Sequence, residues 1–227
     1  MKIVYYLGGI IVLEMYLFIN PLGGVCYEAE KNILKLVAQS EDKINFRFIP
    51  LLSLKTISLV MKRQGLDLTD LKARKLVAKQ LYRFALDYKA ALFQSQKRGR
   101  AFLLAMQEQL INQNAPYCDE LIYQIAKQCQ LDVEMFKQDR HASFTIQSFK
   151  QDQEMAAKMN VFSHPTLVLY NLEGCDCALS LTDCNSFELL QDVLAGKVIP
   201  KEFFRQSHFV SKQAFTKFPN IIKILQD

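Results

Sequence analysis

The stretch LEMYLFINPLGGVC, residues 13–26, decides the fold of this chain. Residues 13–19 are almost continuously apolar, which is typical of a strand buried on both faces in a parallel or mixed sheet. The next five residues, NPLGG at 20–24, have the composition of a turn. From Val25 to about Ala38 the apolar positions follow helical spacing, so the sequence predicts a strand, a turn and a helix in succession.

A second strand is expected at 44–49, where apolar and polar residues alternate until Pro50. Strand, helix and strand in this order form a βαβ unit. A region that is nearly all helical follows, and its apolar spacing places helices within 67–114, at 118–129, at 133–139 and at 143–159.

Further strands are expected after the helical region. Leu167–Tyr170 and Ala178–Leu181 are apolar runs on either side of a Glu173-Gly174 turn, which predicts a hairpin. A last helix at 186–195 ends at Gly196, a common residue after helix C-termini.

The complete order predicts an α/β protein with a thioredoxin-like fold and a large all-helical insertion. We expect residues 1–60 and 145–227 to form the thioredoxin-like domain and residues 61–144 to form the insertion.

Composition excludes several classes of protein. Of the 227 residues, 50% are hydrophobic and 22% are charged, which excludes intrinsic disorder, collagen and coiled coil. Twenty-eight basic residues face 23 acidic ones, a mild excess that does not by itself indicate a nucleic-acid-binding protein. The six cysteines have irregular spacing, which favours free thiols in a reducing cytoplasm over a disulfide framework.

The apolar run from Ile3 to Leu13 has eleven residues, whereas a membrane span takes about 20. It follows Lys2, as a secretory signal would, but no small-x-small cleavage site follows and Glu14 interrupts it. We therefore expect a cytoplasmic protein without a membrane partner, with secretion as the alternative.

In a thioredoxin-like fold the turn after the first strand holds the redox site. Its first cysteine lies at the N-terminus of the helix, where N–H groups stabilise a thiolate, and a second cysteine three positions on resolves the mixed disulfide. Counting from Pro21, Gly23 occupies the first position and Cys26 the second. A lone thiol cannot form an intramolecular disulfide, so we expect a degenerate redox site without dithiol activity. Cys26 is then a small core residue, or a monothiol that forms mixed disulfides.

His164-Pro165-Thr166 precedes the third expected strand, where this fold carries a cis-proline opposite the redox turn. A cis-Pro165 would shape a groove in which an extended peptide can pair with the loop backbone. His164 and Pro165 are therefore our candidate partner-binding residues. His164 would also lie near Cys26, and a catalytic His–Cys pair is the less favoured alternative to a packed histidine.

The remaining motifs indicate no metal and no cofactor. Cys175, Cys177 and Cys184 could offer thiolates to zinc, but their spacing is not that of a structural site and no histidine lies close in sequence, so they are expected at the solvent edge. No glycine-rich phosphate loop is present. Lys97–Arg100 (KRGR) is expected to be a short solvated basic turn.

From about Leu13 to about Tyr170 the chain resembles the DsbA-related, thioredoxin-like family called YjbH or SpxH. Members open with L-E-x-Y-x-F-x-D-P-L-C-x-x-C, which residues 13–26 match except at Asn20 and Gly23. The other matching segments lie in the helical region and before the third strand: YKAALFQ at 88–94, Phe102-Leu103, Gln107-Glu108, LDVEMF at 131–136 and the proline loop before Leu167.

The resemblance implies a cytoplasmic adaptor that binds the transcription factor Spx and promotes its degradation by the ClpXP protease. Gly23 in place of the first cysteine and the lack of a His/Cys-rich N-terminal segment argue against redox or metal chemistry, and the region beyond Tyr170 matches poorly. The alternatives are a DsbA-like thiol oxidoreductase or isomerase that uses Cys26 alone and, last, a glutathione-dependent isomerase or transferase, for which Gly23 offers no hydroxyl or thiol.

Overall fold

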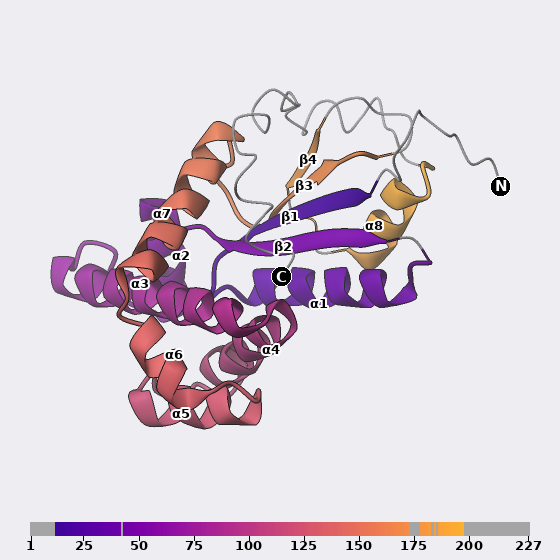
Figure 1. Cartoon of the computed structure of the whole chain (residues 1–227). Coiled ribbons are helices and arrows are strands. Elements are labelled where there is room, and N and C mark those ends of the chain that lie inside the picture. The colour runs from indigo at the N-terminus through magenta and orange to yellow at the C-terminus, as the bar shows by residue number, and fades with distance from the viewer. Residues whose placement is uncertain (1–11, 42, 173–177, 183, 185, 198–227) are drawn as a thin grey trace.

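A mixed four-stranded sheet forms the centre of the molecule in the computed structural model (Figure 1), which describes residues 12–41, 43–172, 178–182, 184 and 186–197. Its strands are β1 (Leu13–Ile19), β2 (Ile44–Pro50), β3 (Thr166–Tyr170) and β4 (Leu179–Thr182), in the order β2-β1-β3-β4. β2 runs parallel to β1, whereas β3 runs antiparallel to both β1 and β4. The predicted strands and the pairing of the hairpin are confirmed, and its Glu173-Gly174 turn lies outside the described residues.

Apart from Glu14, β1 is apolar because helices cover both faces of the sheet. Met15, Leu17 and Ile19 point to the face covered by α1 (Gly24–Gln39) and α8 (Phe187–Leu194), which contact each other. Phe18 points to the opposite face and packs with Met155 and other residues of α7 (Ser143–Lys158). The two-residue period of a strand divides its side chains between two cores.

Seven helical elements lie between β2 and β3 (Figure 1), in agreement with the prediction that this region is nearly all helix. In chain order they are α2 (Leu54–Arg63), α3 (Leu71–Gln94), α4 (Gln96–Gln107), the π-helical turn η1 (Glu108–Asn112), α5 (Asp119–Gln128), α6 (Val133–Asp139) and α7. The proposed domain limits of 60/61 and 144/145 fall inside α2 and α7, and the division itself stays a prediction.

Two local predictions in this region need correction. The KRGR segment is the first turn of α4 rather than a separate solvated turn. Ser95 caps that helix by accepting from the Arg98 N–H, and the Arg100 guanidinium lies 4.4 Å from the centre of the Phe46 ring. The sequence interpretation also missed α2, although Ser53 provides its N-cap by accepting from the Thr56 N–H at 3.1 Å.

A buried ion pair joins the helical elements to the sheet. The Lys89 ammonium of α3 lies 2.7 Å from an Asp152 oxygen of α7, and Arg47 of β2 approaches the other oxygen at 3.6 Å. Both Lys89 and Asp152 are almost inaccessible to solvent. No helix in the part of the chain described here is both long and apolar enough to span a bilayer.

Candidate functional site

The turn between β1 and α1 has the geometry that a redox turn requires, without the first thiol. Asn20 organises it, because its backbone oxygen accepts from the Gly23 N–H at 2.9 Å and its side-chain oxygen accepts from the Leu22 N–H at 3.0 Å. Gly23 is the N-cap of α1 in an extended conformation, and no side chain caps the helix there. The position of the missing nucleophile is therefore preserved while its chemistry is absent.

Cys26 points into the core, with 1% of its surface exposed. Its Sγ accepts a hydrogen bond from the Asn20 N–H at 3.2 Å. Burial raises the pKa of the Cys26 thiol far above its ordinary value, and the hydrogen bond from Asn20 offsets only part of that rise. The first turn of a helix normally favours a thiolate, so desolvation is the dominant influence here. The thiol is protonated at neutral pH.

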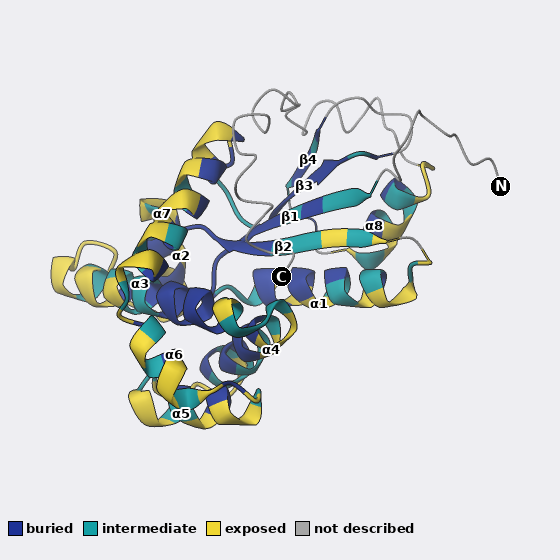
Figure 2. Cartoon of the chain, in the orientation of Figure 1, coloured by how far each residue is buried: buried dark blue, intermediate teal, exposed yellow. Residues whose placement is uncertain are grey.

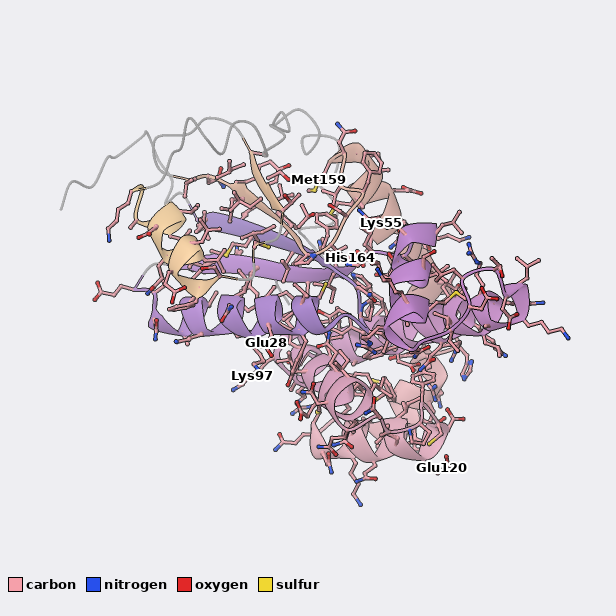
Figure 3. All side chains as sticks on the ribbon, turned by 180° about the vertical axis from the view of Figure 1, so that it is seen from behind. Glu28, Lys55, Lys97, Glu120, Met159 and His164 are labelled. Atoms are coloured by element: carbon pink, nitrogen blue, oxygen red, sulfur yellow. The ribbon has the colours of Figure 1, made fainter. Side chains whose placement is uncertain are left out.

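His164 lies beside this thiol, as the sequence predicted, with its Nδ1 3.6 Å from Cys26 Sγ. Figure 3 shows His164 and Lys55 close together where the sheet meets α2. Burial and the positive charge of Lys55 lower the pKa of His164 to about 4. A neutral imidazole next to a neutral thiol is not the thiolate–imidazolium pair of a cysteine nucleophile, so the contact supports packing over catalysis.

The peptide bond between His164 and Pro165 is cis, which confirms the prediction. The strand register explains its location: Thr166 pairs with Phe18 near the end of β1, so Pro165 lies next to the turn that follows Ile19. The Thr166 hydroxyl donates to the Ser163 carbonyl oxygen at 2.9 Å and closes the loop locally. Gly23, Cys26, His164 and Pro165 therefore come together from two distant parts of the sequence.

Exposed apolar side chains adjoin this site. Val25, with 53% of its surface exposed, precedes Cys26, and Phe162, with 70% exposed, comes two residues before His164. Leu54, also 70% exposed, precedes the lysine that acts on His164. Each of the three segments that meet at this site therefore carries an exposed large apolar residue, which favours a contact surface here.

Sequence reasoning missed two residues that shape the site. Burial is the main cause of the lowered pKa of His164, and the charge of Lys55 adds to it; Lys55 lies in the first turn of a helix that was not predicted. Glu30, one helical turn after Cys26, is completely buried, and burial raises its pKa to about 8. Its Oε1 accepts from Gln107 Nε2 of α4 at 2.8 Å. The sequence did contain a sign of the buried Glu30, because this glutamate lies on a helix face that is otherwise apolar.

The cysteines proposed as alternative metal ligands give no support for a metal centre. Cys175 and Cys177 lie outside the described residues. Cys184 was expected at the solvent edge, which is wrong, because it is completely buried. Within the described ranges, no three His, Cys, Asp or Glu side chains gather in a way that could hold a metal ion.

Comparison with known proteins agrees with this geometry. The family model described as "Thioredoxin" matches residues 16–192, most of the chain. This chain belongs to the thioredoxin family. The match extends past Tyr170, where the resemblance seen in the sequence ended, to include β4 and most of α8.

The resemblance to the YjbH/SpxH proteins is also confirmed. A "ClpXP adapter protein SpxH" from Bacillus licheniformis is 32% identical over 199 residues, covering 80% of this chain and 66% of the relative. The protein of that name from Bacillus subtilis is 29% identical over 202 residues, with the same coverage. This chain thus spans about two thirds of the length of these relatives.

A solved structure supports the fold alone. The thiol-disulfide exchange protein α-DsbA2 from Wolbachia pipientis superposes with a TM-score of 0.55 at 15% identity, covering 82% of each chain. The predicted α/β, DsbA-like fold with a helical insertion is therefore confirmed.

Proposed function

We propose that this chain is a cytoplasmic adaptor that binds the transcription factor Spx and promotes its degradation by the ClpXP protease without dithiol redox chemistry. The relatives named for a ClpXP adapter role supply the activity. An adaptor needs only to raise the local concentration of its client at the protease, which depends on binding surfaces rather than on a thiol.

The single observation that carries the proposal is the state of Cys26. The thiol is buried and protonated, and the residue three positions before it is Gly23, so no disulfide can form within the turn. A thioredoxin-like fold usually positions a nucleophile at this site. Here the turn after β1 and the cis-proline loop lie together without one. We propose that evolution has kept the surface of this site while its chemistry has been lost.

We propose the cis-proline loop as part of the client contact, with His164 and Pro165 as partner-binding residues. Phe162 is exposed two residues before His164 in the same loop, and Val25 is exposed next to Cys26 in the sequence. An extended segment of a client could lie along the loop backbone, as peptides do in other β-pairing complexes. In this arrangement the segment 61–144 forms the insertion and residues 1–60 with 145–227 form the thioredoxin-like part.

The test is a reconstituted degradation assay with purified ClpXP, Spx and this protein. We expect the protein to accelerate loss of Spx several-fold over ClpXP alone. A substrate degraded by ClpXP without an adaptor serves as the control and keeps its rate. Unchanged Spx degradation would contradict the proposal.

The second candidate is a thiol oxidoreductase or isomerase that uses Cys26 alone, and its one structural basis is the 3.6 Å distance between His164 and Cys26, although both groups are neutral. This function requires a substrate disulfide to reach a sulfur with 1% of its surface exposed. Turnover of insulin disulfides by the purified protein, lost in Cys26→Ser, would establish it over the adaptor role. We expect no turnover.

A further inference from the structure

The N-terminal half of α3 projects beyond the rest of the molecule together with the loop before it. α3 has 24 residues and is roughly 36 Å long. From Leu81 to Ala91 it is largely buried, whereas Val77 is its only buried residue before that point. Figure 2 shows the free end of α3 and the adjoining loop as exposed. We call residues 64–79 the projection.

The projection carries large apolar side chains in solvent. Leu71 and Leu76 have 76% and 68% of their surfaces exposed. Leu66 and Leu68, in the loop, are also exposed. Scattered exposed leucines are ordinary, but four within eleven residues at one end of the molecule indicate a contact surface.

Positive charge is concentrated in the projection and in the segments on either side of it. Residues 54–83 contain eight lysines and arginines and only two aspartates, while the rest of the chain has twenty basic and twenty-one acidic residues. The whole positive net charge therefore belongs to α2 and the first half of α3. Within the projection itself, Lys72, Arg74, Lys75 and Lys79 outnumber Asp67 and Asp70.

The lysines of the projection are not paired with its acidic residues, so their charges are available to a partner. Lys72, Lys75 and Lys79 follow i, i+3, i+7 spacing and so share one face of α3 with Leu76. None of the ion pairs given for the described residues involves these lysines. Asp67 and Asp70 are engaged locally, since they accept from Thr69 and from the Lys72 and Ala73 N–H groups.

We infer that the projection is a docking surface for an acidic, leucine-bearing segment of a partner protein. Glutamate or aspartate side chains of the segment would meet Lys72, Lys75 and Lys79, and its apolar side chains would cover Leu71 and Leu76. Complementary charge speeds and orients the encounter, while apolar burial supplies affinity. This is a second contact surface, beyond the client contact proposed at the cis-proline loop.

Other occupants fit less well. Residues 198–227 contain five basic and two acidic residues, so the charge of that segment opposes its docking on a basic surface. A second copy of the chain would bring two basic projections together. Residues 54–81 contain no aromatic residue, and aromatic side chains are the usual anchors of a helix at a membrane interface.

The projection also adjoins the candidate site. A pocket of about 270 Å³ lies at its base, lined by Leu22 of the redox turn together with Arg63, Gln64 and Gln80. A segment bound along the projection can therefore continue toward the redox turn. The projection and the client contact at the cis-proline loop therefore adjoin each other, but binding at either surface does not require binding at the other.

The test measures binding of a fluorescein-labelled 16-residue peptide of glutamate and leucine at helical spacing by the full chain, followed by fluorescence anisotropy. We expect Lys72→Glu/Lys75→Glu/Lys79→Glu to weaken binding about tenfold or more, since three favourable charge pairs become repulsive. The matched variant Lys43→Glu/Lys97→Glu/Lys150→Glu has the same net charge with three exposed lysines changed elsewhere, and it should weaken binding less than about twofold. Leu71→Ser/Leu76→Ser should also weaken it, although no charge changes.

An equal loss of peptide affinity in the two triple variants would overturn the inference, because binding would then depend only on the overall charge of the protein. So would unchanged binding in the leucine variant, binding of phosphatidylserine vesicles in place of the peptide, or self-association abolished by the lysine changes. The degradation assay separates this inference from the proposed function. Normal acceleration of Spx degradation without peptide binding rejects only the docking surface, and peptide binding without acceleration rejects only the adaptor role.

Discussion

Two opposite influences act on the sulfur atom of Cys26. The first turn of α1 and the N–H of Asn20 favour a thiolate, whereas removal of water from the side chain favours the thiol. Desolvation dominates because only 1% of the residue is exposed. In an active redox turn the exposed N-cap thiol avoids this cost, and here that position is Gly23.

Replacing Gly23 tests whether only the nucleophile is missing. A Cβ at Gly23 would lie 3.1 Å from the Asn20 Cβ and 3.2 Å from its carbonyl oxygen, a tight fit that needs a shift of a few tenths of an ångström. The backbone of Gly23 is extended with φ −98°, which any residue adopts. We expect Gly23→Cys to gain insulin-reducing activity from a background of none.

Gly24→Cys is the matched control for this experiment. Its Cβ meets only Ile111, at 3.8 Å, so the substitution fits better but places the thiol off the N-cap. It should gain no activity. A folded Gly23→Cys protein without turnover would show that more than the nucleophile has been lost.

Glu30 makes stability depend on pH. Its pKa of about 8 in the folded protein lies above the ordinary value of 4.5, so the folded state holds a proton that the unfolded state releases between these values. The free energy of unfolding should therefore fall as pH rises from about 4.5 to 8, by at most about 1.4 kcal/mol per pH unit. Protonated Glu30 can donate from its second oxygen to Gln107 Oε1, and both atoms are buried without another partner.

Glu30→Gln should remove this dependence while keeping the contact, since an amide can pair with Gln107 in the same way. Urea unfolding at pH 5, 6.5 and 8 measures it, and the advantage of Glu30→Gln over the unchanged protein should grow with pH. The exposed Glu28→Gln on the same helix should follow the unchanged protein at each pH. A constant difference across this range would mean that Glu30 is already ionised.

At the scale of elements, periodicity predicted the strands and most helices because each buries one regular face. It failed where tertiary contacts decide the local structure. α2 follows β2 after only a short connection, and its apolar residues are interrupted by exposed Leu54 and Leu59, which blurs the helical pattern. Lys97–Arg100 has the composition of a turn. It is helical because Gly99 packs closely against α3, and the segment forms the first turn of α4.

Gly99 allows the close approach of α4 to α3. A Cβ there would lie 2.7 Å from Leu92 Cδ2 and 2.9 Å from the Leu92 Cα and backbone nitrogen, so the backbone of one helix must move. We expect Gly99→Ala to lower the free energy of unfolding by about 1–3 kcal/mol, although alanine is the better helix former. Denaturant unfolding measures this loss. Equal stability, with the neighbouring exposed Arg98→Ala as reference, would contradict the proposed contact.

The Lys89–Asp152 pair holds α3 to α7. Asp152→Asn removes the negative charge and leaves the buried ammonium without its counterion at 2.7 Å, which should cost about 3–5 kcal/mol in the free energy of unfolding. Thermal or urea unfolding measures the change. Glu134→Gln breaks the Lys137–Glu134 pair, which has the same length but lies in solvent, and it should have no measurable effect. Similar effects of the two substitutions would show that burial of the first pair is unimportant.

At the scale of the whole molecule, the sequence predicted the architecture because the order of β and α segments permits few sheets. The strand order and the meeting of Cys26 with His164, 138 residues apart, follow from that topology. The electrostatics could not be predicted in the same way. The pKa of His164 depends on burial and on Lys55, which lies 109 positions earlier in the sequence and approaches the histidine only in the folded chain.

The central claim is that a thioredoxin scaffold serves here as a binding device whose remaining thiol takes no part in its activity. It is tested most directly by the rate of Spx degradation by ClpXP in the presence of the unchanged protein and of Cys26→Ala, under reducing conditions. The account predicts that both proteins accelerate degradation to the same extent. Loss of acceleration in a folded Cys26→Ala protein would contradict it.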